Sequence, residues 1–289
     1  MSTRGPEGAA PPLPQGTSAG TAGERPPRRS FPGRRLVWYW LLPVAVVCWE
    51  LATRSAQAAY FPPPSLIVAR LHELWFSGPV TRAFLTDEAV ADLLPSLGRL
   101  FAGWAAACAA GVAIGVALGR SRRLSALVEP LLHFGRSVPP TTLVPVFLVL
   151  FKIGTPMQLA SIVYGVVWPV LINSMDGART VDRQYIETGA VYRLGPWQRL
   201  TRIILPGASP KIFAGLRLSV SLALIMMIIS ELVGSSEGIG HRMLEAQSQF
   251  DIPAMWAGIV LLGLLGIVLN AAFLGFERTM LSWHRGARS

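Results

Sequence analysis

The side chains whose chemistry stands out in this sequence are charged residues within long apolar segments. Glu50 lies late in the first such segment and Glu231 late in the fifth. A carboxylate is costly in hydrocarbon and is by default paired or functional. We interpret Glu50 as a residue that reaches the membrane interface by snorkelling. Serine and glycine residues surround Glu231, so this carboxylate either accepts structural hydrogen bonds or lies in a bent segment that lines a cavity.

Two arginines have a charge and shape suited to an anionic ligand. Arg136 and Arg217 flank or interrupt apolar segments, and a guanidinium pairs well with anions. A carboxylate at Glu231 would instead repel an anion. Both arginines are expected near the cytoplasmic ends of their segments, where arginine often serves topology alone.

No grouping of residues in the sequence is suited to catalysis or metal binding. Cys48 and Cys108 lie inside apolar runs and are expected to act as packing residues. The four histidines form no HxxxH or HExxH pattern, and no P-loop or Gly-rich nucleotide fingerprint is present. The sequence therefore predicts no catalytic residue, no metal site and no cofactor. A membrane-embedded enzyme would need convergent Asp, His or Cys, so it is the weaker alternative.

The composition indicates that the largest surface of the chain faces lipid. Hydrophobic residues make up 52% of the sequence and charged residues only 15%, and the mean hydropathy is +0.45. A soluble domain has about a quarter of its residues charged. The net charge of +10 does not indicate nucleic acid, because the arginines lie in the gaps between apolar runs and not in one polar domain.

Six apolar segments are long enough to span a membrane, which requires about 20 residues each. Residues 1–35 lack apolar periodicity and are rich in Pro, Gly, Ser and Arg, which predicts a disordered tail before a transmembrane domain over 36–289. The third segment is the least regular, because Arg136 and the Pro139-Pro140 pair interrupt it. The six expected spans are 36–53, 97–119, 130–151, 157–175, 212–234 and 254–276.

The distribution of basic residues predicts the orientation, since Lys and Arg concentrate in cytoplasmic loops. With both termini in the cytoplasm, every basic cluster lies on one side, and the connections 57–91 and 235–250 lie outside. The clusters are Arg28 to Arg35, Arg120 to Arg123, Arg179 to Lys211 and Arg278 to Arg288.

A stripe of glycines runs along the second segment. Gly111, Gly115 and Gly119 recur every four residues, a spacing that lets another helix backbone approach closely. The partner helix belongs either to the same subunit or to a second one.

The polar segment 178–211 is expected to form two short helices that begin near Asp182 and Pro196. Apolar residues recur there at steps of three or four, from Ile186 to Ile204. Helices this short need docking surfaces, so one side is expected to rest on the membrane domain and the other to face a cytoplasmic partner. The alternative is a loop that lies on the lipid headgroups.

The segment 178–211 resembles a motif of a known protein family. Glu187-Thr188-Gly189 followed by Ile203-Ile204-Leu205-Pro206 resembles the cytoplasmic "EAA" loop of binding-protein-dependent ABC importer permeases, which reads E-A-A, three residues, G, nine residues, I-x-L-P. The motif glycine falls at Arg193 in this chain, and the nearest glycine, Gly195, comes two positions later. The bend is therefore expected within a residue or two of Arg193.

Further stretches over about 60–284 are similar to the nitrate, sulfonate and taurine branch of these permeases, and their order and spacing are more specific than any one of them. They are Phe61-Pro62-Pro63-Pro64, Ser96-Leu97-Gly98-Arg99, Arg136-Ser137-Val138-Pro139-Pro140, Trp168-Pro169-Val170-Leu171-Ile172-Asn173, Gly215-Leu216-Arg217 and Ser230-Glu231-Leu232-Val233.

The resemblance implies an all-α permease with six spans in the cell inner (plasma) membrane, which imports a small solute such as an organic sulfonate or nitrate. It implies a homodimer, cytoplasmic ABC ATPase subunits that hydrolyse ATP, and an extracytoplasmic solute-binding protein. A secondary transporter is the remaining alternative, but it predicts inverted repeats that the sequence does not show. Arg136, Arg217 and Glu231 become candidate pathway or gate residues. The candidate residues for coupling to the ATPase are Glu187, Gly189, Arg193, Leu194, Gly195, Trp197, Leu205 and Pro206. Glu187 is expected near the first turn of its helix, where a carboxylate can hold backbone donors, and Pro206 is expected to end the second helix. The apolar stripe around Leu194 and Trp197 is expected to form the surface offered to the ATPase.

Overall fold

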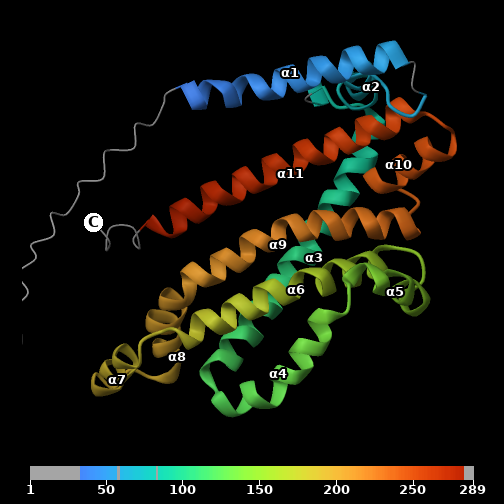
Figure 1. The fold of residues 1–289 in the computed structure, drawn as a ribbon. Helices are drawn as coiled ribbons and strands as arrows, with labels where there is room; N and C mark the ends of the chain where they lie inside the picture. The colour runs from blue at the N-terminus through green and yellow to red at the C-terminus, as the bar shows by residue number, and fades with distance from the viewer. Residues whose placement is uncertain (1–32, 57–58, 83, 283–289) are drawn as a thin grey trace, which may run out of the picture. The chain divides into compact units, whose positions relative to one another are not determined.

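The computed structural model describes residues 33–56, 59–82 and 84–282, and all regular secondary structure in these ranges is helical (Figure 1). Most of the tail predicted at 1–35 lies outside the described residues. The contacts divide the chain after Ala45, so the first half of α1 is one unit and residues from Val46 onward form another.

The elements follow one another in a simple order. They are α1 Gly33–Ala56, α2 Pro64–Trp75, the 3-10 turn η1 Val80–Arg82, α3 Asp87–Arg120, α4 Arg122–Ser137, the 3-10 turn η2 Pro140–Leu143, α5 Val144–Phe151, α6 Thr155–Arg179, α7 Arg183–Val191, α8 Pro196–Arg199, the π-helical turn η3 Leu200–Ile204, α9 Leu205–Gly234, α10 Ile239–Ser248 and α11 Ile252–Met280.

Four helices of the described residues are long and apolar enough to cross a membrane, and a bent pair makes a possible fifth span. The four are α3, α6, the continuous helix from α8 through α9, and α11. The first predicted span, 36–53, lies within α1, which is not among these four. The all-helical membrane fold is therefore confirmed, while the count of six spans is approximate.

The third predicted span, 130–151, is not one helix. The pair formed by α4 and the segment from η2 through α5 bends by 82°. Val138 and Pro139 have extended backbones, with ψ of 119° and 125°. Proline disfavours helical geometry at the preceding residue and removes a backbone donor, so the Pro139-Pro140 pair ends α4 and starts a new turn.

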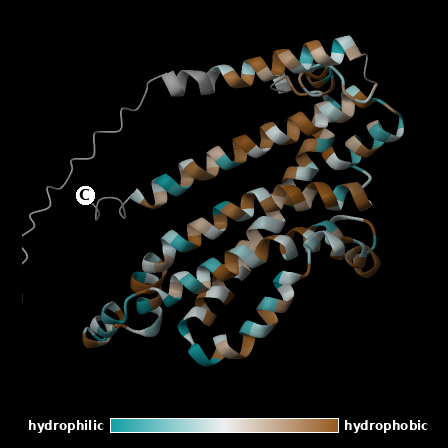
Figure 2. Cartoon of the chain, viewed as in Figure 1, coloured by the Kyte–Doolittle hydropathy of each residue, from teal (hydrophilic) through white to brown (hydrophobic). Residues whose placement is uncertain are grey.

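The core of the bundle is α6, which packs against α3 on one side and α9 on another. Figure 2 shows hydrophobic residues along α9 and α11 and hydrophilic ones at the turn between α3 and α4. The buried centre is mainly aliphatic and methionine side chains, among them Leu100, Ile162, Val166, Met226 and Met227.

The glycine stripe of α3 is the reason that α6 can approach so closely. A Cβ at Gly115 would lie 2.5 Å from the carbonyl oxygen of Leu171, and one at Gly111 would lie 3.0 Å from Val170. The stripe therefore packs within the subunit, which was one of the two alternatives for it.

The neighbours of these glycines also fix the direction of the helices. Gly103, Gly111 and Gly115 of α3 face Ile162, Val170 and Ser174 of α6, so the two helices run parallel. The chain between them must return along the bundle through α4 and α5. Arg120 and Arg179 consequently lie at the same end, which we call the basic end.

Candidate coupling segment and polar sites of the bundle

The segment 178–211 folds as the two short helices that the sequence predicts. Asp182 caps α7, because its side chain accepts a hydrogen bond from the Gln184 N–H at 2.9 Å. Pro196 occupies the first turn of α8, where a missing N–H costs nothing. The Gly195 N–H donates to Gln198 Oε1 at 3.0 Å, which satisfies one further donor at the start of this helix.

The bend between these helices is a Schellman motif centred on Arg193. The Arg193 N–H donates to the Ala190 carbonyl and the Leu194 N–H to the Gly189 carbonyl, both at 2.9 Å. Arg193 has φ +54°, in the left-handed region that favours glycine. Gly195 has an ordinary φ of −64°. The position of the family's glycine thus falls at Arg193, as the sequence register predicts.

Gly189 lets α7 pack directly on the following helix. A Cβ at this buried position would lie 2.7 Å from Ile203 Cδ1 and 3.5 Å from Leu194 Cδ1. The half-buried Leu194 therefore packs inside the segment and does not form the outward surface that its periodicity predicts.

Glu187 lies in the middle of α7, not in its first turn. It accepts from Arg183 Nε at 2.6 Å, and both side chains are largely exposed. The prediction that Glu187 holds backbone donors at the helix start is wrong, because Asp182 at the N-cap takes that role by accepting from the Gln184 N–H.

Pro206 does not end the second helix, contrary to prediction. The helix continues from Pro196 to Gly234 through the π turn η3. The Leu205 N–H bonds to the Leu200 carbonyl five residues earlier, so the turn is wide. Pro206 then falls in the first turn of α9, where it is accommodated.

The exposed aromatic side chains of the segment are Trp197, as the sequence predicts, and two tyrosines that it did not predict. Trp197 is 73% exposed, but it borders a groove along α3 that includes Trp104 and Val116. Tyr185 and Tyr192 are 65% and 77% exposed and border a second groove with Thr188 and Arg202. Sequence periodicity missed both, because they lie off the apolar stripe.

Glu231 belongs to a buried polar network at the end of the bundle opposite the basic end. Its carboxylate accepts hydrogen bonds from Ser96 Oγ at 2.7 Å and the Gly240 N–H at 2.9 Å, and it lies 3.3 Å from Arg99 Nη1. Arg99 also pairs with Glu237 at 2.5 Å. The geometry supports the structural interpretation of Glu231.

A second branch of this network joins α3 to α10. Asp92 accepts from the Gly238 N–H at 3.2 Å and from Arg242 Nε at 2.9 Å. The sequence reasoning missed Asp92 and the role of Arg99. The available signal was their spacing with Ser96, which places all three on one face of α3.

Two further polar contacts join neighbouring elements at this end. Glu50 accepts from the Ser65 N–H at 3.0 Å, so it caps α2 in addition to pairing with Arg54. Asp251 caps α11 and pairs with Arg70 at 2.6 Å. Partial burial raises the pKa of Asp251, but the Arg70 hydrogen bond and charge outweigh it and leave the pKa below its ordinary value.

Arg136 and Arg217 lie at the middle depth of the bundle, not near the ends of spans as predicted. The Tyr164 hydroxyl donates to the carbonyl of Gly135, next to Arg136, at 2.7 Å. Gly215, two residues before Arg217, faces Pro169. Tyr164 and Pro169 are both central in α6. The two arginines are exposed, and neither has a hydrogen bond or ion pair within the described part of the chain.

The structure therefore brings the coupling candidates together in one compact segment and leaves Arg136, Arg217 and Glu231 apart from it. Within the described residues, no group of three or more His, Cys, Asp or Glu could hold a metal ion.

Comparisons with known proteins agree with this arrangement. The model of the family "Binding-protein-dependent transport system inner membrane component" matches residues 109–282. A putative aliphatic sulfonates transport permease protein of Bacillus subtilis is 29% identical, with 88% of this chain and 91% of the relative covered. A bicarbonate transport system permease protein of Synechocystis is 32% identical over 78% of this chain and 81% of the relative.

The fold is also found among solved structures. The chain matches an inward-facing structure of the MetNI methionine ABC transporter with a TM-score of 0.55 and 18% identity, over 64% of this chain and 92% of the other. On the family match, the chain belongs to the binding-protein-dependent transport system inner membrane components, the permease subunits of ABC importers, in which a separate subunit hydrolyses ATP.

Proposed function

We propose that two copies of this permease form the pathway for a small anion across the cell inner membrane. An ABC importer permease implies ATPase and binding-protein partners. The proposal adds a homodimer with its basic end in the cytoplasm, since basic residues concentrate on that side.

The observation that best supports an anionic solute is the pair of arginines at the middle of the bundle. Arg136 and Arg217 are exposed and level with the centre of α6, and neither is paired with any residue that the structure describes. A charge at this depth is costly in lipid, so it must face a water-filled path or a partner. The relatives named for aliphatic sulfonates and bicarbonate both refer to anions.

We further propose that the segment 178–211 couples this pathway to the ATPase. The Schellman bend at Arg193 and the packing of Gly189 on Ile203 make the two short helices one rigid body. The continuous helix from Pro196 to Gly234 joins this body to the bundle without a break. A displacement of α7 would therefore be passed directly into α9.

Uptake into proteoliposomes by the assembled transporter, with its binding protein and ATPase, tests the solute class. The variants are Arg136→Gln and Arg217→Gln, with Arg123→Gln as the control because Arg123 is exposed at the basic end. Uptake of ethanesulfonate or bicarbonate should fall about tenfold in the first two, the usual scale for one lost charged contact, and Lys should partly restore it. Unchanged uptake in both variants would overturn the anionic pathway while leaving the permease assignment intact.

A further inference from the structure

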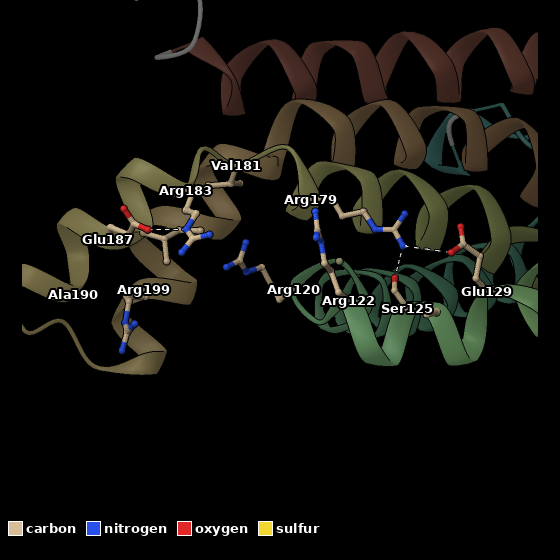
Figure 3. Close-up of a pocket in the computed structure, with 13 residues that line it drawn as sticks. Arg120, Arg122, Ser125, Glu129, Arg179, Val181, Arg183, Glu187, Ala190 and Arg199 are labelled. Atoms are coloured by element: carbon tan, nitrogen blue, oxygen red, sulfur yellow. Dashed lines mark hydrogen bonds and ion pairs between the residues drawn. The ribbon is translucent and has the colours of Figure 1, made fainter.

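A strongly basic cavity lies at the basic end of the bundle, between the turn that joins α3 to α4 and the coupling segment (Figure 3). Its volume is about 980 Å³. Five arginines line it, and each comes from a different helix: Arg120 of α3, Arg122 of α4, Arg179 of α6, Arg183 of α7 and Arg199 of α8. Two carboxylates, Glu129 and Glu187, line the same cavity, so three positive charges are in excess.

Three of the arginines have partners inside the chain. Arg183 pairs with Glu187 at 2.6 Å. Arg179 donates to Ser125 and lies 4.0 Å from Glu129. Arg199 Nε donates to the Leu194 carbonyl at 3.0 Å.

Arg120 and Arg122 differ from these three. Neither makes a hydrogen bond or ion pair with any residue in the described ranges. Figure 3 shows the Arg120 side chain extending toward the coupling segment and the Arg122 side chain rising beside Arg179. Like charges that line one cavity repel one another, and an anion that enters the cavity relieves this repulsion. A guanidinium binds the oxygens of a phosphate group through paired, charge-assisted hydrogen bonds.

The surroundings of the cavity favour a lipid headgroup as the ligand. The cavity lies where α3 and α6 end. With the basic end in the cytoplasm, as proposed above, the cavity comes close to the headgroups of the inner leaflet. Its wall also contains apolar side chains, including Ala126, Val181 and Ile186, against which a glycerol backbone can pack. Anionic headgroups attract basic segments at this level of the membrane.

We infer that this cavity binds a phosphate-bearing anion, the headgroup of an anionic phospholipid, through Arg120 and Arg122. Arg183 and Ile186 of α7 line the same cavity, so a ligand held by Arg120 and Arg122 also contacts the coupling segment. It thereby holds this segment in place against the bundle. A free phosphate ester offers the same recognition chemistry, and the experiment below separates the two sources.

The test uses the full-length chain in a neutral detergent, with lipid binding followed by native mass spectrometry. The probes are phosphatidylglycerol, phosphatidylcholine with the same acyl chains, and soluble glycerol 3-phosphate. The variant is the pair Arg120→Gln with Arg122→Gln. Arg123→Gln is the matched control, because Arg123 is a neighbouring exposed arginine outside the cavity lining.

Phosphatidylglycerol should bind more tightly than phosphatidylcholine, and the double variant should weaken this binding about tenfold or more, since two charge-assisted contacts are lost. The control should change the affinity by less than about twofold. Competition by glycerol 3-phosphate at equal concentration would show that the phosphate alone suffices and that the natural source is soluble. Equal binding of the two lipids, or equal affinity in the double variant and the wild type, would overturn the inference.

This result is independent of the proposed solute and of coupling, since it measures binding to the permease alone. Thermal unfolding of each variant without lipid provides the folding control. A double variant that unfolds at the wild-type temperature but loses the lipid establishes that the cavity arginines act on the ligand.

Discussion

The backbone N–H of Leu194 donates to the carbonyl of Gly189 at 2.9 Å, which closes the bend between the two helices of the coupling segment. The residue between them in the turn, Arg193, is forced to φ +54°. A side chain in this region costs about 1 kcal/mol, so the bend is under strain that glycine would relieve.

Arg193→Gly should therefore stabilise the protein by about 0 to 1 kcal/mol. Glycine relieves the backbone strain at this position, and this gain offsets the larger conformational entropy that glycine gives the unfolded chain. Thermal unfolding in detergent measures this. Gly195→Ala is the matched control and should be tolerated, since its φ is −64° and the nearest atom to a new Cβ lies 3.9 Å away. A large loss of stability with Gly195→Ala, together with a loss for Arg193→Gly, would mean that the bend is centred at Gly195.

The close packing of α3 on α6 gives a second prediction. Gly115→Ala should destabilise the protein by about 1–3 kcal/mol, because the new Cβ would lie 2.5 Å from the Leu171 carbonyl oxygen. Gly98→Ala on the same helix has no atom within 4 Å of the new Cβ and should stabilise by up to about 1 kcal/mol. Equal unfolding temperatures for the two variants would contradict the helix contact.

The third prediction concerns the buried pair of Glu231 and Arg99. Glu231→Leu should cost about 3–5 kcal/mol, because it leaves Arg99, Ser96 and the Gly240 N–H without their common acceptor. Glu245→Gln at the exposed end of the same network should change stability by less than about 1 kcal/mol. Chemical denaturation in detergent measures both variants. If Glu231→Leu is as stable as the wild type, the network does not hold α9 to α3 and α10.

The pair of Asp251 and Arg70 predicts a pH dependence. The pKa of Asp251 is lower in the folded chain than its ordinary value of 3.8, so the folded state binds the proton less readily than the unfolded state. The stabilisation is fully present above about pH 4 and is lost as the pH falls through the folded pKa.

Asp251→Asn keeps a capping oxygen but removes the charge. It should lower stability at pH 7, by an amount that shrinks as the pH falls through the folded pKa. Glu73→Gln is the control, because Glu73 also contacts Arg70 but is 66% exposed. Unfolding midpoints between pH 2 and pH 7 test this. A destabilisation by Asp251→Asn that is the same at every pH would show that the charge contributes nothing.

Sequence reasoning located the helices better than it located their ends. Apolar length predicted four of the six spans as single helices, because a helix that crosses lipid must be long and apolar. The same signal could not show that Pro139 bends the third span, since proline inside a long apolar run also occurs in continuous helices, as Pro169 does in α6. The π turn before Pro206 was equally hidden, because a wide turn leaves no pattern in residue type.

Some of the polar sites could be predicted from the sequence and others could not. Asp182 and Pro196 were recognised because capping and first-turn positions depend on local sequence. Arg99 and Glu231 are 132 residues apart in the chain, and only the packing of α3 beside α9 brings them together. The depth of Arg136 could not be predicted either, because it depends on α4 beginning at Arg122, directly after α3, and not at residue 130.

The central claim is that the segment 178–211 transmits ATPase motion to the bundle, and solute-stimulated ATP hydrolysis by the reconstituted transporter tests it most directly. The variant is Tyr185→Ala with Tyr192→Ala, the exposed aromatic residues of the segment, and the control is Phe134→Ala, which is 72% exposed on α4. Removing two aromatic anchors from an interface can cost about 4 kcal/mol or more. Stimulation should be lost in the double variant and kept in the control, with both proteins inserted and folded. Full stimulation of the double variant would contradict the account.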